Sequence, residues 1–590
     1  MSLRNWLMAA AAAAALVSAA NATSAADLGS DQPTFTPHAL SASDVRLYRE
    51  IFADEEAGRF GAAKSRLVEV SDRSLAGYVE AAHFLSPRAR RIPIKQLTAW
   101  LAEYDNLPVA ARIHELAEHK DAKLRKRHRV AIEALPVVHH RGGGYEDTDI
   151  PETLISEVAR AAQPQIEAAI HAGQPQAAEA TLNTLIAGGS APGADIAYLS
   201  HRVASSYMAE GQDDAAVRVA SAVTGADRAS LPQLDWDEGL ADYRLGKYLD
   251  SAQHFEALAQ SGAVPNYTRS AAAFWAARAH LAAGDPLRVI TLLTAATREQ
   301  PTFYGLLAEK MLGQQSQTTF AEPVLDEQSY EAMAQIPAVH RAVALWQVEQ
   351  TEYLAGEMDR ALTAIDLRQG EAYAALAHRL DLPNLELRAC ETAASRGVML
   401  TGLFPVPRYA PKSGYQIDPS LILAFTRAES RFRPDAVSNK GARGLMQIMP
   451  GTAIQIDRTG ASEKRLEDPS YNLELGQRYL ASILGQVNGN LVELAAAYNA
   501  GPGAITRWVG MRGNMMQDPL LFIESIPASQ TRDYVKRVLT YYWMYARRTG
   551  EDAPTLDQTA NGEWPTYRGY PTPSAAPAQN VVVSDAATPD

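Results

Sequence analysis

The chain has 590 residues, enough for several domains at about 150 residues each. Hydrophobic residues make up 47% of the chain and charged residues 21%, as in ordinary globular proteins, which excludes disorder throughout. The net charge of −13 argues against a protein that coats nucleic acid, so we expect no nucleic-acid partner. The single cysteine, Cys390, excludes an intramolecular disulfide and thiolate metal clusters.

The N-terminal segment, residues 1–26, has the pattern of an export signal. Arg4 supplies a positive charge, residues 6–17 form a short apolar stretch, and small residues precede a cleavage site near Ala26. The alternative is a membrane anchor, but the stretch is shorter than the roughly 20 apolar residues that a spanning helix needs. We therefore expect a periplasmic protein with no integral membrane segment after the signal is cleaved.

From about residue 160 to 370 the sequence repeats an Ala-rich amphipathic run, a glycine and a second amphipathic run. The glycines at these breaks are Gly173, Gly211, Gly246, Gly284 and Gly356. They recur at intervals of about 36 residues, or twice that interval before the last of them, which fits the period of stacked helix pairs. The pattern predicts a mainly α protein with an α-superhelical solenoid over residues 27–400, with chance spacing of glycine-terminated helices as the alternative.

Two polar segments interrupt this half of the chain. One is a basic run at residues 123–129, and the other joins His139 and His140 to three glycines at residues 142–144. A run of charges is usually a solvated helix face, and adjacent histidines do not converge on a metal as an i, i+4 pair does. We assign neither segment a chemical role.

A change in composition marks a second domain. Prolines and a glycine predict a linker at residues 401–416, followed by a catalytic domain at 417–550. Residues 405–550 hold 18 Lys and Arg against 12 Asp and Glu, so this part is basic while the rest of the chain is acidic. The Pro- and Ala-rich segment 551–590 is predicted to be a disordered tail.

The first chemical signal is a glutamate on an apolar helix face. Asp418 and Pro419 suit a helix start, and Glu429 follows Phe425 by four residues on the same apolar stripe. Burial would raise the pKa of this carboxyl group, as a general acid requires near neutral pH. The alternative is a buried Glu that pairs with a nearby arginine, such as Arg427.

Three further segments carry polar groups at helix ends or in flexible loops. The segment 441–450 has two glycines and could bring the Gln447 amide to a ligand. An apolar helix from 491 ends in Tyr498 and Asn499, where side chains reach clefts readily. Residues 525–536 lead into a Tyr-rich helix that runs to about residue 545.

The order of four motifs resembles the soluble lytic transglycosylases. These motifs are Glu429-Ser430, Gly-Leu-Met-Gln at 444–447, Ala-Tyr-Asn-Ala-Gly at 497–501 and Thr-Arg-Asp-Tyr-Val at 531–535. They span a single stretch in the C-terminal part of the chain, and the segments 273–278 and 301–305 are more weakly similar to the helical part of the family. The chain departs from the family at Gln530, where the family usually has Glu, which puts a charged role there in doubt.

The resemblance implies a lysozyme-like domain that cleaves the β-1,4 bond between N-acetylmuramic acid and N-acetylglucosamine in peptidoglycan. The product is a 1,6-anhydromuramoyl end, formed without water, metal or organic cofactor. Among the matched motifs Glu429 is the carboxylate that carries over, so it would act as acid and then as base. The residues expected to bind or orient substrate are Ser430, Met446, Gln447, Tyr498, Asn499 and Tyr534.

Two other functions stay open at this point. A hydrolytic muramidase would use the same Glu429 as acid and a water as nucleophile. In a different class of protein, the solenoid would be a scaffold that binds cell-wall synthesis or remodelling proteins, since concave repeat surfaces commonly bind partners.

Overall fold

The computed structural model describes residues 35–89, 92–120, 154–298, 301–314, 319–366, 368–511 and 513–569. The predicted export signal, the basic run, the adjacent histidines and the end of the chain beyond residue 569 lie outside these ranges. Secondary structure in the described residues consists of helices with isolated β-bridges, which confirms the mainly α prediction. In the same ranges no helix has the length and apolar character that crossing a membrane requires.

The chain folds into two compact units. Unit 1 contains residues 146–319 and the chain from Tyr409 onward, and unit 2 contains residues 25–145 and 320–408. The sequence predicts one domain over residues 27–400, and the structure divides that segment between the two units. The division arises because the first helices of the chain pack with one another and with a helix around Leu345, which comes far later in the sequence.

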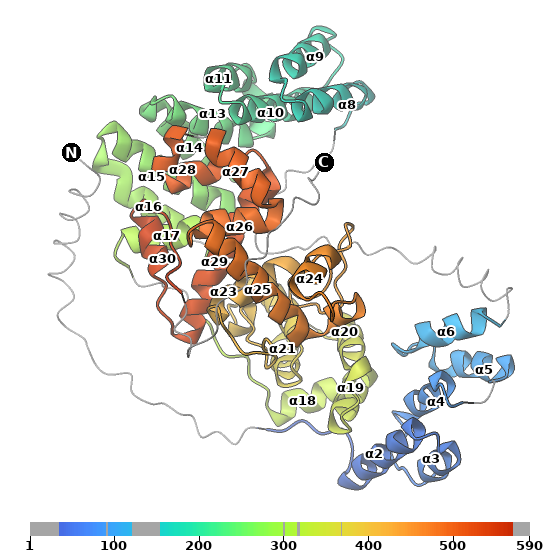
Figure 1. The fold of residues 1–590 in the computed structure, drawn as a ribbon. Coiled ribbons are helices and arrows are strands. Elements are labelled where there is room, and N and C mark those ends of the chain that lie inside the picture. Colours follow the sequence, from blue (N-terminus) through green and yellow to red (C-terminus); the bar gives the residue numbers. More distant parts are fainter. Residues whose placement is uncertain are drawn as a thin grey trace, which may run out of the picture. The chain divides into compact units, whose positions relative to one another are not determined.

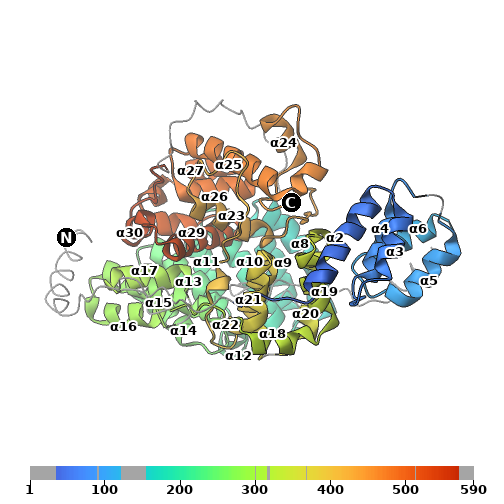
Figure 2. The same cartoon turned by 90° about the horizontal axis from the view of Figure 1, so that it is seen from below.

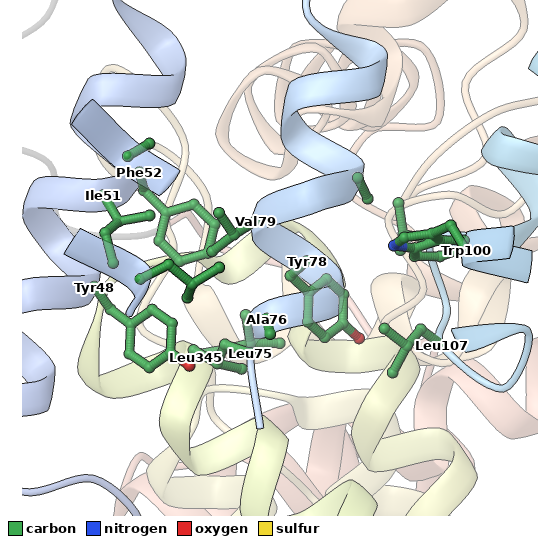
Figure 3. Packing of buried hydrophobic residues seen from close by; sticks show 14 of the residues in the cluster. Tyr48, Ile51, Phe52, Leu75, Ala76, Tyr78, Val79, Trp100, Leu107 and Leu345 are labelled. Carbon is green, nitrogen blue, oxygen red and sulfur yellow. The ribbon is translucent and has the colours of Figure 1, made fainter. Parts of the chain in front are cut away.

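Unit 2 is built around a core shared by its two chain segments. Tyr48, Ile51, Trp100 and neighbouring apolar side chains pack together with Leu345 of the second segment (Figure 3). Gln347 adds a polar link, because its side-chain oxygen accepts hydrogen bonds from the backbone N–H groups of residues 39 and 40, each at 2.8 Å. The helices are α2 (Ala42–Glu56), α3 (Phe60–Leu67), α4 (Ala76–Leu85), α5 (Ile94–Tyr104), α6 (Ala110–Glu118), α18 (Glu327–Ala334), α19 (Pro337–Gln347), α20 (Leu354–Ala364), α21 (Gly370–Arg379) and α22 (Pro383–Ala394).

Residues 157–311 of unit 1 form successive helix pairs, here called the solenoid (Figure 1). Four predicted breaks are confirmed, since the glycines at 173, 211, 246 and 284 have φ between 65° and 76°, a conformation that favours glycine at helix ends. The prediction for Gly356 is wrong: it lies inside α20, where a Cβ would come within 2.8 Å of Pro108. The solenoid helices are α8 (Glu157–His171), α9 (Pro175–Ala187), α10 (Gly193–Ala209), α11 (Asp213–Ser221), α12 (Gly225–Ser230), α13 (Gln233–Arg244), α14 (Tyr248–Gln260), α15 (Asn266–Ala283), α16 (Val289–Ala296) and α17 (Phe303–Met311).

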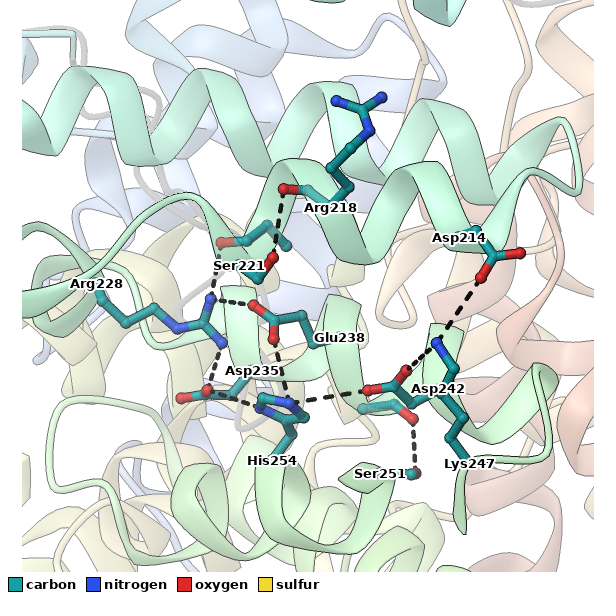
Figure 4. A network of polar contacts seen from close by, with 12 residues as sticks. Asp214, Arg218, Ser221, Arg228, Asp235, Glu238, Asp242, Lys247, Ser251 and His254 are labelled. Atoms are coloured by element: carbon teal, nitrogen blue, oxygen red, sulfur yellow. Dashed lines mark hydrogen bonds and ion pairs between the residues drawn. The ribbon is translucent and has the colours of Figure 1, made fainter. Parts of the chain in front are cut away.

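Buried and partly buried charges also join neighbouring solenoid helices. Arg228 of α12 contacts Asp235 and Glu238 of α13, each at 2.5 Å, and His254 of α14 lies 3.1 Å from Glu238 (Figure 4). Lys247, in the turn between α13 and α14, extends the network to Asp242. Because each carboxylate faces a cation or an imidazole from another segment, the network favours one register between the three helices.

The C-terminal domain of unit 1 comprises residues 409–569. Its helices α29 and α30 lie against α17 of the solenoid (Figures 1 and 2). The helices are α23 (Pro419–Ser430), α24 (Pro450–Ile456), α25 (Pro469–Gln486), α26 (Leu491–Ala500), α27 (Pro502–Met511), α28 (Pro519–Glu524), α29 (Ser529–Thr549) and α30 (Pro554–Ala560).

The predicted linker at 401–416 is divided between the two units. Its first residues form the short 3₁₀ helix η3 (Thr401–Leu403), which is buried in unit 2, and the boundary lies after Arg408. Beyond the boundary the Ser413 hydroxyl donates to Glu474 at 2.6 Å, so this stretch is part of the C-terminal domain. The proline content predicts a linker but gives no indication of these contacts, which depend on distant residues.

The prediction of a disordered tail is wrong for residues 551–569. This segment contains α30, and the Trp543 indole donates to Thr555 at 3.1 Å. Further on, the Trp564 indole donates to the Met516 carbonyl at 3.0 Å, and the Tyr567 hydroxyl accepts from the Asp418 amide at the same distance. Large aromatic side chains bury enough surface to order a segment whose composition is otherwise that of a tail.

Candidate active site

Glu429 lies in the last turn of α23. The helix begins as predicted, with the Asp418 side chain accepting a hydrogen bond from the Ser420 amide at 2.8 Å and Pro419 in the first turn. It ends at two consecutive left-handed residues, Arg431 with φ 53° and Phe432 with φ 63°. Such backbone costs free energy for residues other than glycine, and the buried Phe432 ring helps to hold the turn in place. The carboxyl group of Glu429 is therefore fixed beside a tight chain reversal.

The environment of Glu429 favours its protonated form. Burial raises the pKa of the Glu429 carboxyl to about 7, although a hydrogen bond from Tyr534 and the charge of Arg537 both act to lower it. The Tyr534 hydroxyl donates to Glu429 Oε1 at 2.5 Å. The Phe425 ring packs against the Tyr498 ring with centroids 4.8 Å apart, one helical turn before Glu429. A salt bridge with an arginine would lower the pKa of this carboxyl group, whereas its burial raises it.

Replacing Tyr534 with Phe should raise the pKa of Glu429 further. The Tyr534 hydrogen bond stabilises the carboxylate, so its removal leaves burial opposed only by Arg537. The titration can be followed by NMR of a carboxyl carbon label. Tyr479→Phe is the matched control, because the Tyr479 ring packs on Tyr498 at 5.3 Å and is not among the groups that shift the pKa of Glu429. An unchanged or lower pKa in Tyr534→Phe would contradict this account.

Side chains from three helices hold the glycine-rich loop at residues 436–449. Ser430 of α23 donates to the Leu445 carbonyl at 2.7 Å, and Tyr498 of α26 donates to the Met446 carbonyl at the same distance. Asn472 of α25 accepts from the Met446 amide at 2.7 Å and donates to two backbone carbonyls. The loop is thus fixed relative to Glu429 on three sides.

Two positions in this loop have left-handed backbone. Gly444 has φ 78°, and a Cβ there would lie 2.1 Å from the Leu466 carbonyl oxygen, so a side chain has no room. Gln447 has φ 48°, and its side-chain amide nitrogen donates to the carbonyls of Ala436 and Gly444 at 3.0 and 2.9 Å. The Gln447 amide therefore braces the loop through its nitrogen.

Five of the seven predicted site residues fall into two groups. Glu429, Tyr498 and Tyr534 come together, since the charge of Glu429 contributes to the raised pKa values of both tyrosines. Ser430 and Met446 are buried and make interior contacts. The Ser430 hydroxyl donates to the Leu445 carbonyl, and the Met446 side chain packs against Gly476.

Direct contact of Ser430 or Met446 with a sugar or a peptide stem does not fit this placement. Asn499 is exposed at the end of α26, and its side-chain oxygen accepts from the Thr531 hydroxyl at 2.7 Å.

Sequence reasoning missed two residues of the site. Arg537 lies three residues after Tyr534, on the same face of α29, and its charge acts on Glu429. Helical spacing from Tyr534 could have found it. Asn472 is different, because it lies outside all four motifs and only the folded chain brings it to the loop.

Comparisons with known proteins decide the family of this domain. The family model described as "Transglycosylase SLT domain" matches residues 409–520. The chain therefore carries an SLT domain. The soluble lytic murein transglycosylase of Escherichia coli K12 is 42% identical over 149 residues, which are 24% of this chain and 23% of that protein. The enzyme of the same name from Salmonella typhimurium is 38% identical over 158 residues, or 26% and 24% of the two chains.

These sequence matches span about a quarter of the length of the curated relatives. The likeness in fold to solved structures covers most of the chain. The crystal structure of the 70 kDa soluble lytic transglycosylase from Escherichia coli superposes with a TM-score of 0.53 at 20% identity, over 89% of this chain and 99% of that one. An inactive Glu-to-Gln mutant of lytic transglycosylase Slt from Pseudomonas aeruginosa gives 0.52 at 19% identity, over 88% of each chain. At this identity the likeness shows the fold, an α-superhelix followed by a lysozyme-like domain.

Proposed function

We propose that this protein is a lytic transglycosylase that cleaves the β-1,4 bond between N-acetylmuramic acid and N-acetylglucosamine in peptidoglycan strands. The observation that carries the proposal is a lone carboxyl group with a pKa of about 7, at the position of the family motif. Within the described residues, no second carboxylate is among the groups that shift this pKa. Most glycosidases use two carboxylates, whereas Glu429 is the carboxylate that the matched motifs carry over, so the motifs favour a reaction in which Glu429 acts twice.

In the first step protonated Glu429 donates its proton to the glycosidic oxygen, which leaves on the N-acetylglucosamine. The 2-acetamido oxygen of the muramoyl sugar forms a bond to the anomeric carbon as the glycosidic bond breaks. In the second step ionised Glu429 removes the proton of the muramoyl 6-hydroxyl. That oxygen then bonds to the anomeric carbon and displaces the acetamido oxygen. Glu429 regains its proton and no water is consumed.

The neighbouring groups support these two steps. The Tyr534 hydrogen bond and the Arg537 charge stabilise Glu429 in the ionised state between the steps, which keeps its pKa near neutrality. The side chains of Tyr498, Gln447 and Asn499 are proposed to position sugar amides. Ser430 and Met446 act indirectly, by fixing the loop that carries Gln447.

The substrate and compartment follow from the same proposal. Residues 405–550 carry an excess of Lys and Arg, 18 against 12 acidic residues, which would attract the free carboxylates of peptidoglycan stems. The export pattern of residues 1–26 favours the periplasm as the location. Binding of cell-wall synthesis or remodelling proteins by the solenoid is a further proposal that its repeat architecture supports.

Mass spectrometry of digested sacculi tests this function. A transglycosylase leaves anhydromuropeptides, which are one water lighter than the products of hydrolysis. We expect anhydro ends as the main product of the wild-type chain. Products that are heavier by one water would identify a hydrolytic muramidase, and the absence of any lytic product would contradict both enzymatic assignments.

A further inference from the structure

Two solenoid segments contact the C-terminal domain through large side chains. The segments are residues 273–278 of α15 and 301–305 at the start of α17, and the reaction proposed above gives them no role. Arg278 Nη2 lies 2.5 Å from Asp518 Oδ2, and the Phe303 ring stacks on Trp543 with centroids 5.4 Å apart. The Tyr304 hydroxyl donates to Glu524. Tyr304 and Phe303 are completely buried, so these contacts belong to a closed interface.

The Tyr304 contact continues into a buried ion pair. Lys536 Nζ lies 2.9 Å from Glu524 Oε1, the oxygen that accepts from Tyr304, and 3.2 Å from Asp533. The Tyr267 ring of α15 lies 5.8 Å from the Lys536 ammonium group. A buried charge pair tolerates little displacement, because separation would leave each charge without its partner in a medium of low dielectric. The solenoid therefore fixes where Glu524 and Lys536 lie.

The helix α28 is held by the solenoid at both of its ends. Asp518, which pairs with Arg278, caps α28 by accepting hydrogen bonds from the amides of residues 520 and 521 at 3.1 Å. Glu524 is the last residue of the same helix and receives the Tyr304 hydroxyl. Arg532 of α29 reaches back and donates to the carbonyl of Glu524, in α28, at 3.5 Å and to that of Ile526 at 3.2 Å. The start of α29 is thus tied to a helix that the solenoid positions.

One turn of α29, residues 534–537, carries side chains that reach both Glu524 and Glu429. Lys536 faces Glu524, while Tyr534 and Arg537, on either side of it in sequence, act on Glu429. Residues two or one apart on a helix point to different faces, so this turn is placed between the solenoid contact and the carboxyl group. Lys536 and Tyr534 belong to one rigid helical turn. A displacement of Lys536 from Glu524 would therefore also move Tyr534 relative to Glu429.

We propose that Tyr304 and Arg278 of the solenoid are positioning residues for the reaction at Glu429. They fix α28 and the first turns of α29, and this keeps the Tyr534 hydroxyl and the Arg537 charge at their places beside the carboxyl group. The proposal rests on the function proposed above. It gives the solenoid a part in setting the acidity of the reacting group, in addition to any role in guiding a glycan strand.

The test compares Tyr304→Phe with the wild-type chain. The substitution keeps the ring and removes the hydroxyl that donates to Glu524. We expect kcat on sacculi to fall about 10-fold, since small misplacements of reacting groups cost rate steeply. We also expect the pKa of Glu429, followed by NMR of a carboxyl carbon label, to rise, because Tyr534 and Arg537 both lower it in the wild type.

Phe303→Leu is the matched control. It disturbs the same interface, but its partner Trp543 lies nine residues after Tyr534 on α29, more than two turns away, and its contact with Tyr304 is to the ring and leaves the hydroxyl in place. We expect this variant to lose stability while the pKa of Glu429 stays at its wild-type value. Asp518→Asn is a second test variant, because Asn can keep the cap of α28 through its side-chain oxygen while losing the charge that pairs with Arg278.

The outcomes separate the two proposals. If Tyr304→Phe and Asp518→Asn lower only the stability and leave both kcat and the pKa of Glu429 unchanged, the positioning role is overturned. If the wild-type chain itself forms no anhydro products, the proposed function fails, whereas the effect of Tyr304→Phe on the pKa can still be measured. A raised pKa in both variants, with an unchanged pKa in Phe303→Leu, supports the positioning role.

Discussion

Glu429→Gln is expected to remove lytic activity on isolated sacculi, with a loss of about 10²–10⁴-fold in kcat. Gln keeps the shape of the side chain and its capacity to accept the Tyr534 hydrogen bond, so the fold should persist. It has no proton to donate to the glycosidic oxygen and cannot accept one from the 6-hydroxyl. Both proposed steps therefore fail in this variant. The measurement is the release of muropeptides at saturating substrate, with folding checked by circular dichroism.

The same experiment has a pH arm. The first step needs protonated Glu429, and burial raises the pKa of this group from its ordinary 4.5 to about 7. Activity of the wild type should therefore be highest below pH 7 and should fall as the pH rises through that value. Glu493→Gln is the control: Glu493 is also half-buried with a raised pKa, but it lies in the first turn of α26, where Asn490 donates to it at 2.9 Å.

Full activity in Glu429→Gln, or a wild-type rate that does not change between pH 6 and 9, would contradict the assignment of this carboxyl group. A loss in Glu493→Gln as large as that in Glu429→Gln would show that any half-buried carboxyl in the domain has the same effect, and the assignment would lose its specificity.

Lys536→Met is expected to lower the free energy of unfolding by about 3–5 kcal/mol. Lys536 is 5% exposed and Glu524 is 2% exposed, so the substitution leaves the Glu524 carboxylate in the interior without its nearer cation, and Arg532, 3.7 Å away, is the cation that remains. The Tyr304 hydroxyl offsets only part of this loss, because it donates a hydrogen bond but carries no charge. Urea unfolding monitored by tryptophan fluorescence gives the measurement.

An exposed ion pair of the same unit supplies the comparison. Lys310 of α17 lies 2.8 Å from Asp557 of α30, with side chains 41% and 56% exposed. Lys310→Met should cost less than about 1 kcal/mol, since solvent and salt screen such pairs. Replacing Lys536 and Glu524 together with Met should recover much of the loss from Lys536→Met. If Lys536→Met lowers the free energy of unfolding no more than Lys310→Met does, the buried pair does not stabilise the fold more than an exposed pair.

The carboxyl group with the raised pKa could be predicted from the sequence because its signal is local. Glu429 follows Phe425 by four residues, and the helical period alone places it on the buried face that raises its pKa. The same holds for the glycine breaks of the solenoid, where backbone geometry at one residue decides the outcome. The prediction of a helix break at Gly356 is wrong because glycine also occurs where another segment approaches closely. The approaching residue is Pro108, which is distant in sequence and cannot be read from the local pattern.

The inner parts of the site could not be predicted, because they depend on contacts between distant segments. Met446 has the polarisable side chain of a ligand contact, but the chain packs it against Gly476 on α25. Ser430 is adjacent to the acid in sequence, yet its hydroxyl serves the backbone carbonyl of Leu445 in the following loop. Similarly, the aromatic residues at 564 and 567 order a segment whose local composition predicts a tail.

The split construction of unit 2 has a consequence for how the chain reaches its native state. Its first helices, α2 to α6, pack with Leu345 and Val348, which ribosomes add only after the whole solenoid has been made. Until then the apolar surface that these later residues cover stays open, and the entropy of a long loop opposes closure. Unit 1 can assemble its solenoid pairs as they emerge. Maturation of this protein is therefore expected to finish with unit 2, whose early half must stay unaggregated while most of the chain is made.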